Sequence, residues 1–364
     1  ADFCPTGAID HTQVDEEVEL EVGAIVLATG SKPFDPAQYD IYDYTKHPNV
    51  VTSMEFERIL SPSGPYHGHL VRPSDGKEPE KIAWLQCVGS RDLHGGAKPY
   101  CSAVCCTYAI KEAIVAKEHV KGALDTAIFY IDMRTHGKDF EKYHNRAEES
   151  GVRFVKSKIS TITPVDNTGS LLIRHTDEGG RRVEEEFDIV VLSVGLGIPN
   201  EAVDLAGKLG IELDPYNFAS TSSFEPVQTS KPGIYVCGAF QGPKDIPQSV
   251  IESSACAAAA EAVLAESRFS LTQTREIPEE TDVSGEPPRI GVFICHCGTN
   301  IAGVVNVATV AEYARTLPDV VYVEENLFSC SQDTQEKMTQ VIKQQGLNRV
   351  VVAACSPRTH EPLF

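Results

Sequence analysis

Hydrophobic positions along the chain form short continuous runs that alternate with stretches of helical spacing. Continuous apolar runs predict buried strands within 20–28 and over 82–88, 127–131, 152–155, 187–194 and 233–237. Apolar residues at helical spacing predict helices over 102–117, 140–149 and 247–266, and a hairpin is expected around Asn167-Thr168-Gly169. This alternation favours an α/β fold with a parallel sheet flanked by helices.

Residues 269–288 interrupt this pattern. They are rich in Pro, Glu, Ser and Thr and have no apolar period, which predicts a linker. Beyond it, strands over 289–294, 320–324 and 349–353 alternate with helices over 307–317 and 331–346. This order predicts a small parallel β-α-β-α-β module. Because crossovers between parallel strands are right-handed, the carboxyl ends of its three strands should share one edge.

Cysteines supply the strongest chemical signal. The chain has 11, and four of them lie close together: Cys87 at a strand end, then Cys101, Cys105 and Cys106 at a helix start. Closely spaced thiolates ligate soft metals or iron–sulfur clusters, and a helix N-terminus stabilises their charge. Structural zinc explains four cysteines equally well by ligand count, although adjacent Cys105-Cys106 departs from the spacing that zinc sites use.

Four more cysteines follow the strands of the second module, namely Cys295, Cys297, Cys330 and Cys355. Ligands in open α/β sheets bind at the carboxyl edge of the strands, so these thiols are expected to converge there. An iron–sulfur cluster is the favoured interpretation. A set of free thiols, or a site in which His296 replaces one ligand, is the alternative. Cys237 and Cys256 are interpreted as small core residues.

Length and charge narrow the class of protein. A chain of 364 residues predicts two or three domains. The net charge of -20 argues against nucleic acid or an anionic membrane as a partner. No apolar run reaches the roughly 18 residues that a membrane span needs, and no signal segment opens the chain, so a cytoplasmic protein is expected. The start at Ala1 and the stop at Phe364 indicate an excerpt of a longer polypeptide.

Six motifs resemble the heterodisulfide reductase A subunits, the flavin and iron–sulfur subunits of methanogens that have relatives in other anaerobes. They are LQCVGSRD (85–92), YCSAVCCTYAIKEA (100–113), GAFQGPKDIPQSV (238–250), ICHCGTNIAGVV (294–305), CSQDTQEK (330–337) and AACSPRTHEPLF (353–364). The resemblance covers nearly the whole chain.

The resemblance implies a fold and a division into domains. Residues 15–268 would form part of a thioredoxin-reductase-like FAD domain, with an inner nucleotide-domain-like unit at about 82–195. Residues 289–364 would be the truncated start of a second N-terminal-type cysteine module. Residues 1–14 would be the tail of a ferredoxin-like insert in which Cys4 helps to ligate a cluster. A chance Cys-Pro turn is the alternative for Cys4.

The resemblance also implies contacts to FAD. The residues concerned are Thr29, Gly30, Gly238, Gln241, Lys244, Ile246 and Gln248. The chain has no G-x-G-x-x-G fingerprint, so it is expected to bind FAD poorly or not at all by itself. Ala239 stands where many related reductases place an Asp. Lys244 is interpreted either as a cation that biases the flavin or as a solvated lysine.

The implied function is that of an oxidoreductase subunit that moves electrons between FAD, 4Fe-4S clusters and partner subunits. The clusters would be held by Cys87, Cys101, Cys105 and Cys106 and by Cys295, Cys297, Cys330 and Cys355. Flavin-based electron bifurcation is the hallmark of the family. The implied partners are other heterodisulfide reductase subunits, a hydrogenase or formate dehydrogenase-type donor and ferredoxin, in a complex that contains a homodimer.

Two further expectations complete the sequence analysis. LQCVGSRD offers one glycine where a dinucleotide loop needs three, and Cys101, Cys105 and Cys106 do not form a Cys-x-x-Cys pair. The chain is therefore expected neither to oxidise NAD(P)H by the usual route nor to reduce a disulfide itself. The alternative function is that of a zinc-stapled scaffold that docks partners without redox chemistry.

Overall fold

The computed structural model describes residues 9–38, 40–166, 168–273 and 279–364. The chain folds as two compact units, Ala1–Leu271 and Thr272–Phe364, and each is described by itself. The predicted ligand Cys4 lies outside the described residues, as does Asn167 of the predicted hairpin.

A five-stranded parallel sheet is the centre of the first unit. Its strand order is β3 (Val50–Thr52), β10 (Ile189–Val194), β4 (Lys81–Val88), β5 (Asp125–Tyr130), β6 (Val152–Lys156). The predicted strands at 82–88, 127–131 and 152–155 are confirmed. The apolar residues of β4 and β5 are almost wholly buried because both faces of a parallel sheet are covered, whereas Phe154 and Val155 of the edge strand β6 are half-buried.

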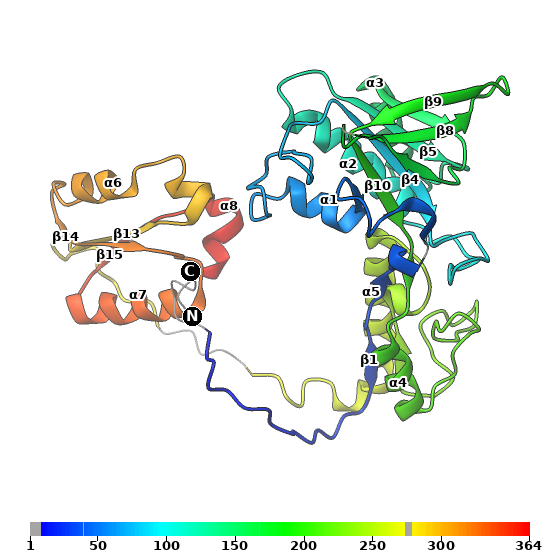
Figure 1. Cartoon of the computed structure of the whole chain (residues 1–364). Helices are drawn as coiled ribbons and strands as arrows, with labels where there is room; N and C mark the ends of the chain where they lie inside the picture. Colours follow the sequence, from blue (N-terminus) through cyan, green and yellow to red (C-terminus); the bar gives the residue numbers. More distant parts are fainter. Residues whose placement is uncertain (1–8, 39, 167, 274–278) are drawn as a thin grey trace. The chain divides into compact units, whose positions relative to one another are not determined.

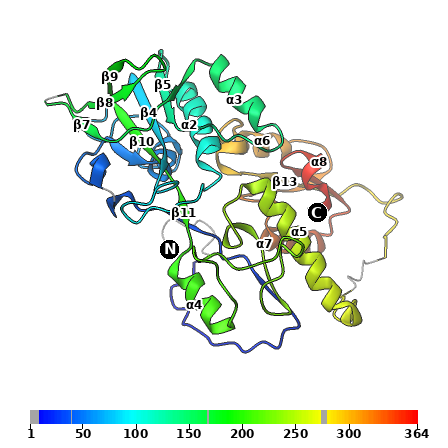
Figure 2. The same ribbon diagram turned by 90° about the vertical axis from the view of Figure 1, so that its right-hand side faces the viewer.

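Helices cover one face of this sheet and a second sheet covers the other (Figures 1 and 2). The helices are α1 (Ser53–Leu60), α2 (Cys105–His119) and α3 (Phe140–Glu149). The antiparallel sheet has the order β7 (Ile162–Pro164), β8 (Leu171–Thr176), β9 (Arg182–Phe187). Trp84 packs against Phe56 on the helical side, and Phe129 packs against Phe187 on the other.

One predicted strand is wrong as a single element. The apolar run 187–194 is divided at Asp188, so that Phe187 ends β9 and β10 begins at Ile189. The Asp188 carboxylate accepts hydrogen bonds from the Glu80 and Lys81 backbone N–H groups and pairs with Arg72. These contacts hold the corner at which the chain passes from one sheet to the other.

A smaller part of the first unit is built on two parallel strands. β1 (Ile25–Leu27) pairs with β12 (Ile234–Val236), and α5 (Ile246–Val263) packs against both strands. α4 (Asn200–Leu209) contributes to a core with Leu27 and Phe240. The antiparallel pair β2 (Lys32–Pro33) and β11 (Leu196–Gly197) connects this part to the larger sheet.

The second unit is a three-stranded parallel sheet with the order β14 (Val320–Asn326), β13 (Ile290–Cys295), β15 (Arg349–Ala353). Val292 and Ile294 pack against α6 (Val307–Ala314), while Phe293 packs on the other face against α7 (Gln332–Gln345). The predicted β-α-β-α-β order is confirmed, and all three strands end at one edge. α8 (Pro357–His360) follows β15.

The remaining helical elements among the described residues are short. They are the 3-10 helices η1 (Pro36–Gln38), η2 (Asp40–Tyr42), η3 (Gly238–Phe240), η4 (Ala265–Ser267) and η6 (Glu361–Leu363), and the π-helix η5 (Gly298–Ala302).

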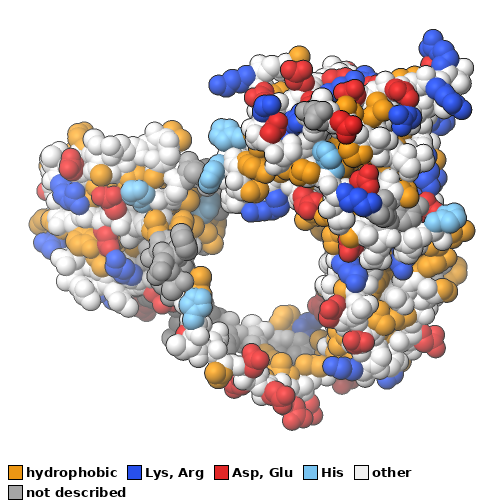
Figure 3. Space-filling model, viewed as in Figure 1, with side chains coloured by type: hydrophobic (Ala, Val, Ile, Leu, Met, Phe, Trp, Pro, Cys, Tyr) orange, Lys and Arg blue, Asp and Glu red, His pale blue; other side chains and the backbone are white. Residues whose placement is uncertain are grey.

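The surface carries many carboxylates. Figure 3 shows acidic side chains gathered along the extended segment at residues 9–23. Among the helices that the structure describes, we find none whose length and apolar character would let it traverse a bilayer.

Candidate functional site

The first thiol set lies at the carboxyl edge of the five-stranded sheet. Cys87 is the penultimate residue of β4, Cys101 lies in the following loop, and Cys105 and Cys106 are the first two residues of α2. The predicted helix start at Ser102 is wrong by three residues. Ala103 has a left-handed backbone, with φ of 63°, which α-helix cannot contain. Both adjacent cysteines therefore sit at the helix N-terminus.

Left-handed backbone conformations concentrate around these thiols. Cys87, Arg91 and Ala103 have φ of 64°, 56° and 63°, which costs a side-chain-bearing residue about 1–2 kcal/mol. Strain of this kind is typical of functional sites. Gly89 also has a positive φ, of 75°, and a Cβ there would lie 2.1 Å from the Phe34 ring. Gly89 thus makes room for Phe34, and the loop is shaped by packing against that ring.

The four thiols lie within electrostatic reach of one another. Burial, followed by repulsion from Cys87 and the neighbouring thiol, raises the pKa of Cys105 far above that of a free cysteine. Burial likewise raises the pKa of Cys106 to about 11, and it raises the pKa of Cys87 against the opposing effect of Arg91. These raised pKa values favour the protonated thiols of Cys87, Cys105 and Cys106, so a metal that binds them must displace protons.

Two arginines flank the set. Arg91 lowers the pKa of Cys87 by charge and hydrogen bonding, although burial dominates that shift. A hydrogen bond to Asp132 raises the pKa of Arg134, and interactions with Cys101 add to this effect. Asp132 pairs with both guanidinium groups. The arginines therefore offset the negative charge that four thiolates would bring to this edge.

Serine hydroxyls connect the loops that carry the thiols. Ser90 and Ser102 share a hydrogen bond of 2.6 Å, and the Leu196 N–H donates to the Ser102 hydroxyl at 2.8 Å. Tyr108 of α2 donates to the Val194 carbonyl at 2.7 Å. Sequence reasoning missed Arg91, Arg134 and these serines. The arginine-containing segment LQCVGSRD was a possible signal, whereas nothing local singles out Arg134.

The second thiol set lies at the shared carboxyl edge of β14, β13 and β15. Cys295 ends β13 and is buried, and Cys297 follows it with partial exposure. Cys330 precedes α7, Cys355 follows β15, and both are exposed. The Asn300 side-chain amide donates to the Cys297 sulfur at 3.9 Å. The structure thus places Cys295 at the end of a strand and the other three predicted thiols in the loops that follow the strands, all at one edge of the sheet.

Both sets offer sulfur donors suited to a thiolate-ligated group. Within the described ranges, no three His, Cys, Asp or Glu side chains are placed so that they would hold a metal ion. Four cysteines nevertheless lie at one sheet edge in each set, and arginines balance charge in the first. The chemistry of these donors therefore fits an iron–sulfur cluster.

The predicted flavin contacts lie at the carboxyl edge of β1 and β12. The Cys237 N–H donates to the Leu27 carbonyl at 3.1 Å, so the two strand ends carry Thr29-Gly30 and Gly238 side by side. Gly30 and Gly238 have φ of 74° and 68°, and no atom of the described residues lies within 4 Å of a Cβ built on Gly30. This open space suits the close approach of a ligand.

Lys244 is not the solvated lysine of the alternative interpretation. Its side-chain nitrogen is buried and donates to Glu252 at 2.6 Å and to the side-chain amide oxygen of Gln241 at 2.5 Å. Glu252 also accepts the Gly238 N–H at 3.0 Å, a role that sequence reasoning missed. The pair fixes the loop below the predicted flavin contacts.

The remaining predicted flavin contacts lie at the start of α5. Gln248 forms a capping box with Asp245, and Ile246 is 79% exposed. Cys237 and Cys256 are buried, as expected of core residues, and Cys256 donates to the Val236 carbonyl at 3.1 Å.

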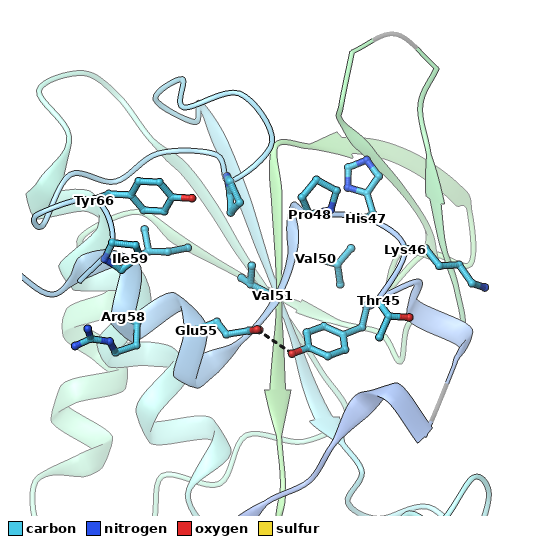
Figure 4. Close-up of a pocket in the computed structure, with 13 residues that line it drawn as sticks. Thr45, Lys46, His47, Pro48, Val50, Val51, Glu55, Arg58, Ile59 and Tyr66 are labelled. Atoms are coloured by element: carbon cyan, nitrogen blue, oxygen red, sulfur yellow. Dashed lines mark hydrogen bonds between the residues drawn. The ribbon is translucent and has the colours of Figure 1, made fainter. Parts of the chain in front are cut away.

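A separate hollow of about 650 Å³ lies along the outer edge of β3 (Figure 4). Tyr44 is one of the residues that line it and donates to Glu55 at 2.9 Å, and burial followed by this bond raises the pKa of Tyr44 to about 12. The outward N–H groups of Val50 and Thr52 already donate to His47 and Glu55. These two groups are therefore not free to pair with an incoming strand.

Sequence comparison finds relatives of named function. The chain is 40% identical over 286 residues to the iron-sulfur A subunit of the CoB–CoM heterodisulfide reductase of Methanocaldococcus jannaschii, covering 78% of this chain and 43% of that protein. It is 42% identical over 280 residues to one such A subunit of Methanopyrus kandleri, covering 75% and 42%. The A subunit of the H(2)/formate:CoB-CoM heterodisulfide,ferredoxin reductase of Methanococcus maripaludis is 38% identical over 282 residues, covering 76% and 43%.

The chain thus spans less than half the length of the curated relatives it matches. No protein-family model matches it. Among solved structures, the thioredoxin reductase of T. acidophilum aligns with a TM-score of 0.42 at 15% identity, covering 66% of this chain and 65% of that one. The sequence identity to several heterodisulfide reductase subunits over three quarters of the chain settles its family. The chain belongs to the family of heterodisulfide reductase A subunits.

Proposed function

We propose that the chain is an electron-transfer segment of a heterodisulfide reductase-like oxidoreductase, with 4Fe-4S clusters at its two thiol sets and FAD at the edge of β1 and β12. The observation that carries the proposal is the first set, in which four mutually interacting thiols lie at one sheet edge between two arginines. Four thiols that lie so close together supply the number and kind of ligands that a 4Fe-4S cluster takes.

The chain's own residues would prepare the first set for this role. A cluster, when bound, supplies one-electron transfer at a potential that the surrounding protein sets. Cys87, Cys101, Cys105 and Cys106 would hold it. Burial of Cys105 and Cys106 excludes water, and Arg91 and Arg134 compensate negative charge. These features stabilise an anionic group next to the apolar core.

The flavin edge supports a second part of the proposal. FAD, when bound, exchanges electrons in pairs or singly. Thr29, Gly30 and Gly238 would border it, and Lys244, neutralised by Glu252, would position the loop beneath. Gly89 contacts Phe34, so the glycine of LQCVGSRD accommodates an aromatic ring in place of a pyrophosphate. This supports the prediction that NAD(P)H is not the reductant.

The names of the relatives guide the choice of partners. One relative is named for H2 or formate and for ferredoxin, and another for ferredoxin and the CoB–CoM heterodisulfide. We propose that this protein likewise assembles with other heterodisulfide reductase subunits, a hydrogenase or formate dehydrogenase-type donor and ferredoxin. Bifurcation at the flavin and assembly through a homodimer are parts of the same proposal.

Metal analysis of the anaerobically purified chain tests the proposal. Iron and acid-labile sulfide in cluster stoichiometry, with a paramagnetic signal after reduction, are expected. Cys106→Ser should abolish the signal of the first set. Cys256→Ser is the matched control, because Cys256 is also buried but lies outside both sets.

Stoichiometric zinc without visible absorbance would contradict the proposal and support the scaffold alternative. Equal loss of iron in Cys106→Ser and Cys256→Ser would also count against it, since the loss would then reflect damage to the fold.

A further inference from the structure

Two buried polar side chains in the second unit have no hydrogen-bond partner among the residues that the structure describes. Asn326 is 4% exposed, and its side-chain amide nitrogen has no hydrogen-bond partner among the described residues. Ser329 is 0% exposed, and its hydroxyl likewise has no partner among them. Each such group destabilises a fold, because its hydrogen bonds to water are lost on burial and are not replaced. Buried polar groups left unpaired require a physical reason, and a bound ligand is one of the common reasons.

Both residues lie shortly before Cys330 in the sequence: Asn326 is the last residue of β14, and Ser329 lies in the loop that follows it. Asn326 is the register partner of Cys295, and the His296 N–H donates to the Asn326 carbonyl at 2.7 Å. Register partners on neighbouring strands project to the same face of a sheet, so the Asn326 amide and the Cys295 thiol share a face. Ser329 directly precedes Cys330.

The shared face is the one that α7 covers. Glu324, two residues before Asn326 on β14, pairs with Lys337 of α7, and Phe293, two residues before Cys295 on β13, packs against Met338 of α7. α7 begins two residues after Cys330. The unpaired amide and hydroxyl thus belong to the same corner as two of the four thiols, where a helix also begins.

A third donor in this region already bonds to sulfur. Asn300 donates its side-chain amide to the Cys297 sulfur at 3.9 Å. Amide and hydroxyl donors of this kind stabilise the extra negative charge of a reduced iron–sulfur cluster and so raise its reduction potential.

We propose that Asn326 and Ser329 donate hydrogen bonds to the sulfur atoms of a cluster held by Cys295, Cys297, Cys330 and Cys355, and that they set its reduction potential. This inference rests on the proposed function. The two residues position and polarise the cluster, whereas the four thiols ligate it. Their lack of partners within the described part of the chain is explained by partners on the cluster.

The test uses the full chain, reconstituted anaerobically with ferrous iron and sulfide and followed by paramagnetic resonance during a redox titration. The two signals are assigned by their loss in Cys330→Ser and in Cys106→Ser. Asn326→Leu and Ser329→Ala should each shift the midpoint potential of the Cys330-dependent signal downward. The Cys106-dependent signal should not move.

Two further readouts separate a role at the cluster from a role in the fold. Without metal, both variants should be at least as stable as the parent chain, because an unpaired buried polar group has been removed. With metal, exchangeable deuterons coupled to the reduced cluster should decrease in each variant. Asn348→Leu is the control: Asn348 bonds to the Arg289 N–H and the Pro287 carbonyl, so this variant should lose stability without a change in potential.

Unchanged midpoint potentials and deuteron couplings in both variants, at unchanged iron content, would overturn the inference while leaving the proposed function intact. A marked loss of stability in the metal-free variants would overturn it as well, because the side chains would then have structural partners. Failure of the parent chain to form the Cys330-dependent signal would instead refute the proposed cluster itself.

Discussion

At the scale of single residues, close approach determines which positions beside the first thiol set tolerate change. A Cβ on Gly195 would lie 2.0 Å from the Ser90 hydroxyl and 2.6 Å from that of Ser102. The two serines bond to each other, and Ser102 also accepts the Leu196 N–H. Because Gly195 has no side chain, the chain directly after β10 can lie close to the loops that carry the thiols.

Gly195→Ala is expected to reduce the free energy of unfolding by about 1–3 kcal/mol and to lower the iron content of the reconstituted chain, because the serine pair must separate. Chemical denaturation and iron analysis measure both effects. Gly197→Ala is the control, since no described atom lies within 4 Å of its Cβ, and it should change stability by no more than about 0.5 kcal/mol. Equal effects of the two substitutions would contradict the role assigned to Gly195.

Glu112 predicts a second residue-scale effect, one that depends on pH. Its carboxyl is buried and accepts the Trp84 indole N–H at 2.8 Å, and burial raises the pKa of Glu112 well above 4.5. The folded chain therefore keeps a proton that the unfolded chain releases as the pH rises above about 4.5, so this group's contribution to stability falls with rising pH.

Glu112→Gln should remove that loss while keeping an acceptor for Trp84. The stability of this variant relative to the parent chain is expected to increase as the pH rises above about 4.5. The increase should reach up to about 1.4 kcal/mol per pH unit between the pKa of Glu112 in the unfolded chain and its higher pKa in the folded chain. Denaturation at several pH values measures this. Glu118→Gln, an exposed position on the same helix, should show no such slope; a flat profile for Glu112→Gln would refute the argument.

At the scale of elements, one carboxylate ties the antiparallel sheet to the parallel sheet. Glu185 of β9 pairs with Arg153 of β6 and Lys81 of β4, each at 2.9 Å, and bonds to His175 at 3.2 Å. Burial alone would raise the pKa of Glu185, but these hydrogen bonds lower it to about 2. Its contribution to stability is present above the unfolded pKa near 4.5 and is lost as the pH falls toward 2.

Glu185→Gln is expected to cost about 1–3 kcal/mol at pH 7, and the difference from the parent chain should begin to shrink as the pH falls below about 4.5 and should disappear only near pH 2. Thermal unfolding at pH 7 and pH 3 tests this. Glu186→Gln, its exposed neighbour on β9, should be neutral at both values. A penalty for Glu185→Gln that is as large at pH 3 as at pH 7 would show that packing matters more than charge.

Elements with a regular local pattern could be predicted from the sequence. α3 and β15 have the predicted bounds because their periodicity and flanking residues agree. The division at Asp188 could not be predicted, since its partners Arg72 and Glu80 are more than 100 residues away. The strand order of the large sheet is likewise set by distant packing, in which β10 lies between β3 and β4.

The candidate site shows the same division. The cysteines could be named from spacing, and the parallel strands account for their gathering at shared edges. Arg134 and Asn326 could not be named from the sequence. Arg134 comes close to Cys101 only in the folded chain, and Asn326 lies opposite Cys295 only because of the register of the two strands. Nor does any local pattern reveal that Lys244 is buried against Glu252.

At the scale of the whole molecule, the chain divides into two units with separate cores. The segment after Leu271 contains exposed Glu279 and Glu280. A glutamate-specific protease should therefore separate the two units there and, apart from trimming of the extended segment at 9–23, leave two fragments that resist further digestion, as mass spectrometry would show. Early cleavage within 82–195, under conditions that leave the segment after Leu271 uncut, would contradict this division.

The unequal exposure of the two thiol sets has a consequence for handling the protein in air. Cys105 and Cys106 are shielded by the core, whereas Cys330 and Cys355 face solvent. Oxygen and peroxide reach exposed sulfur first, so damage should begin with sulfenic acids and intermolecular crosslinks in the second unit. If both proposed clusters are bound, an aerobically stored sample would then lose the cluster of the second unit first, and the cluster at Cys105 and Cys106 would outlast it.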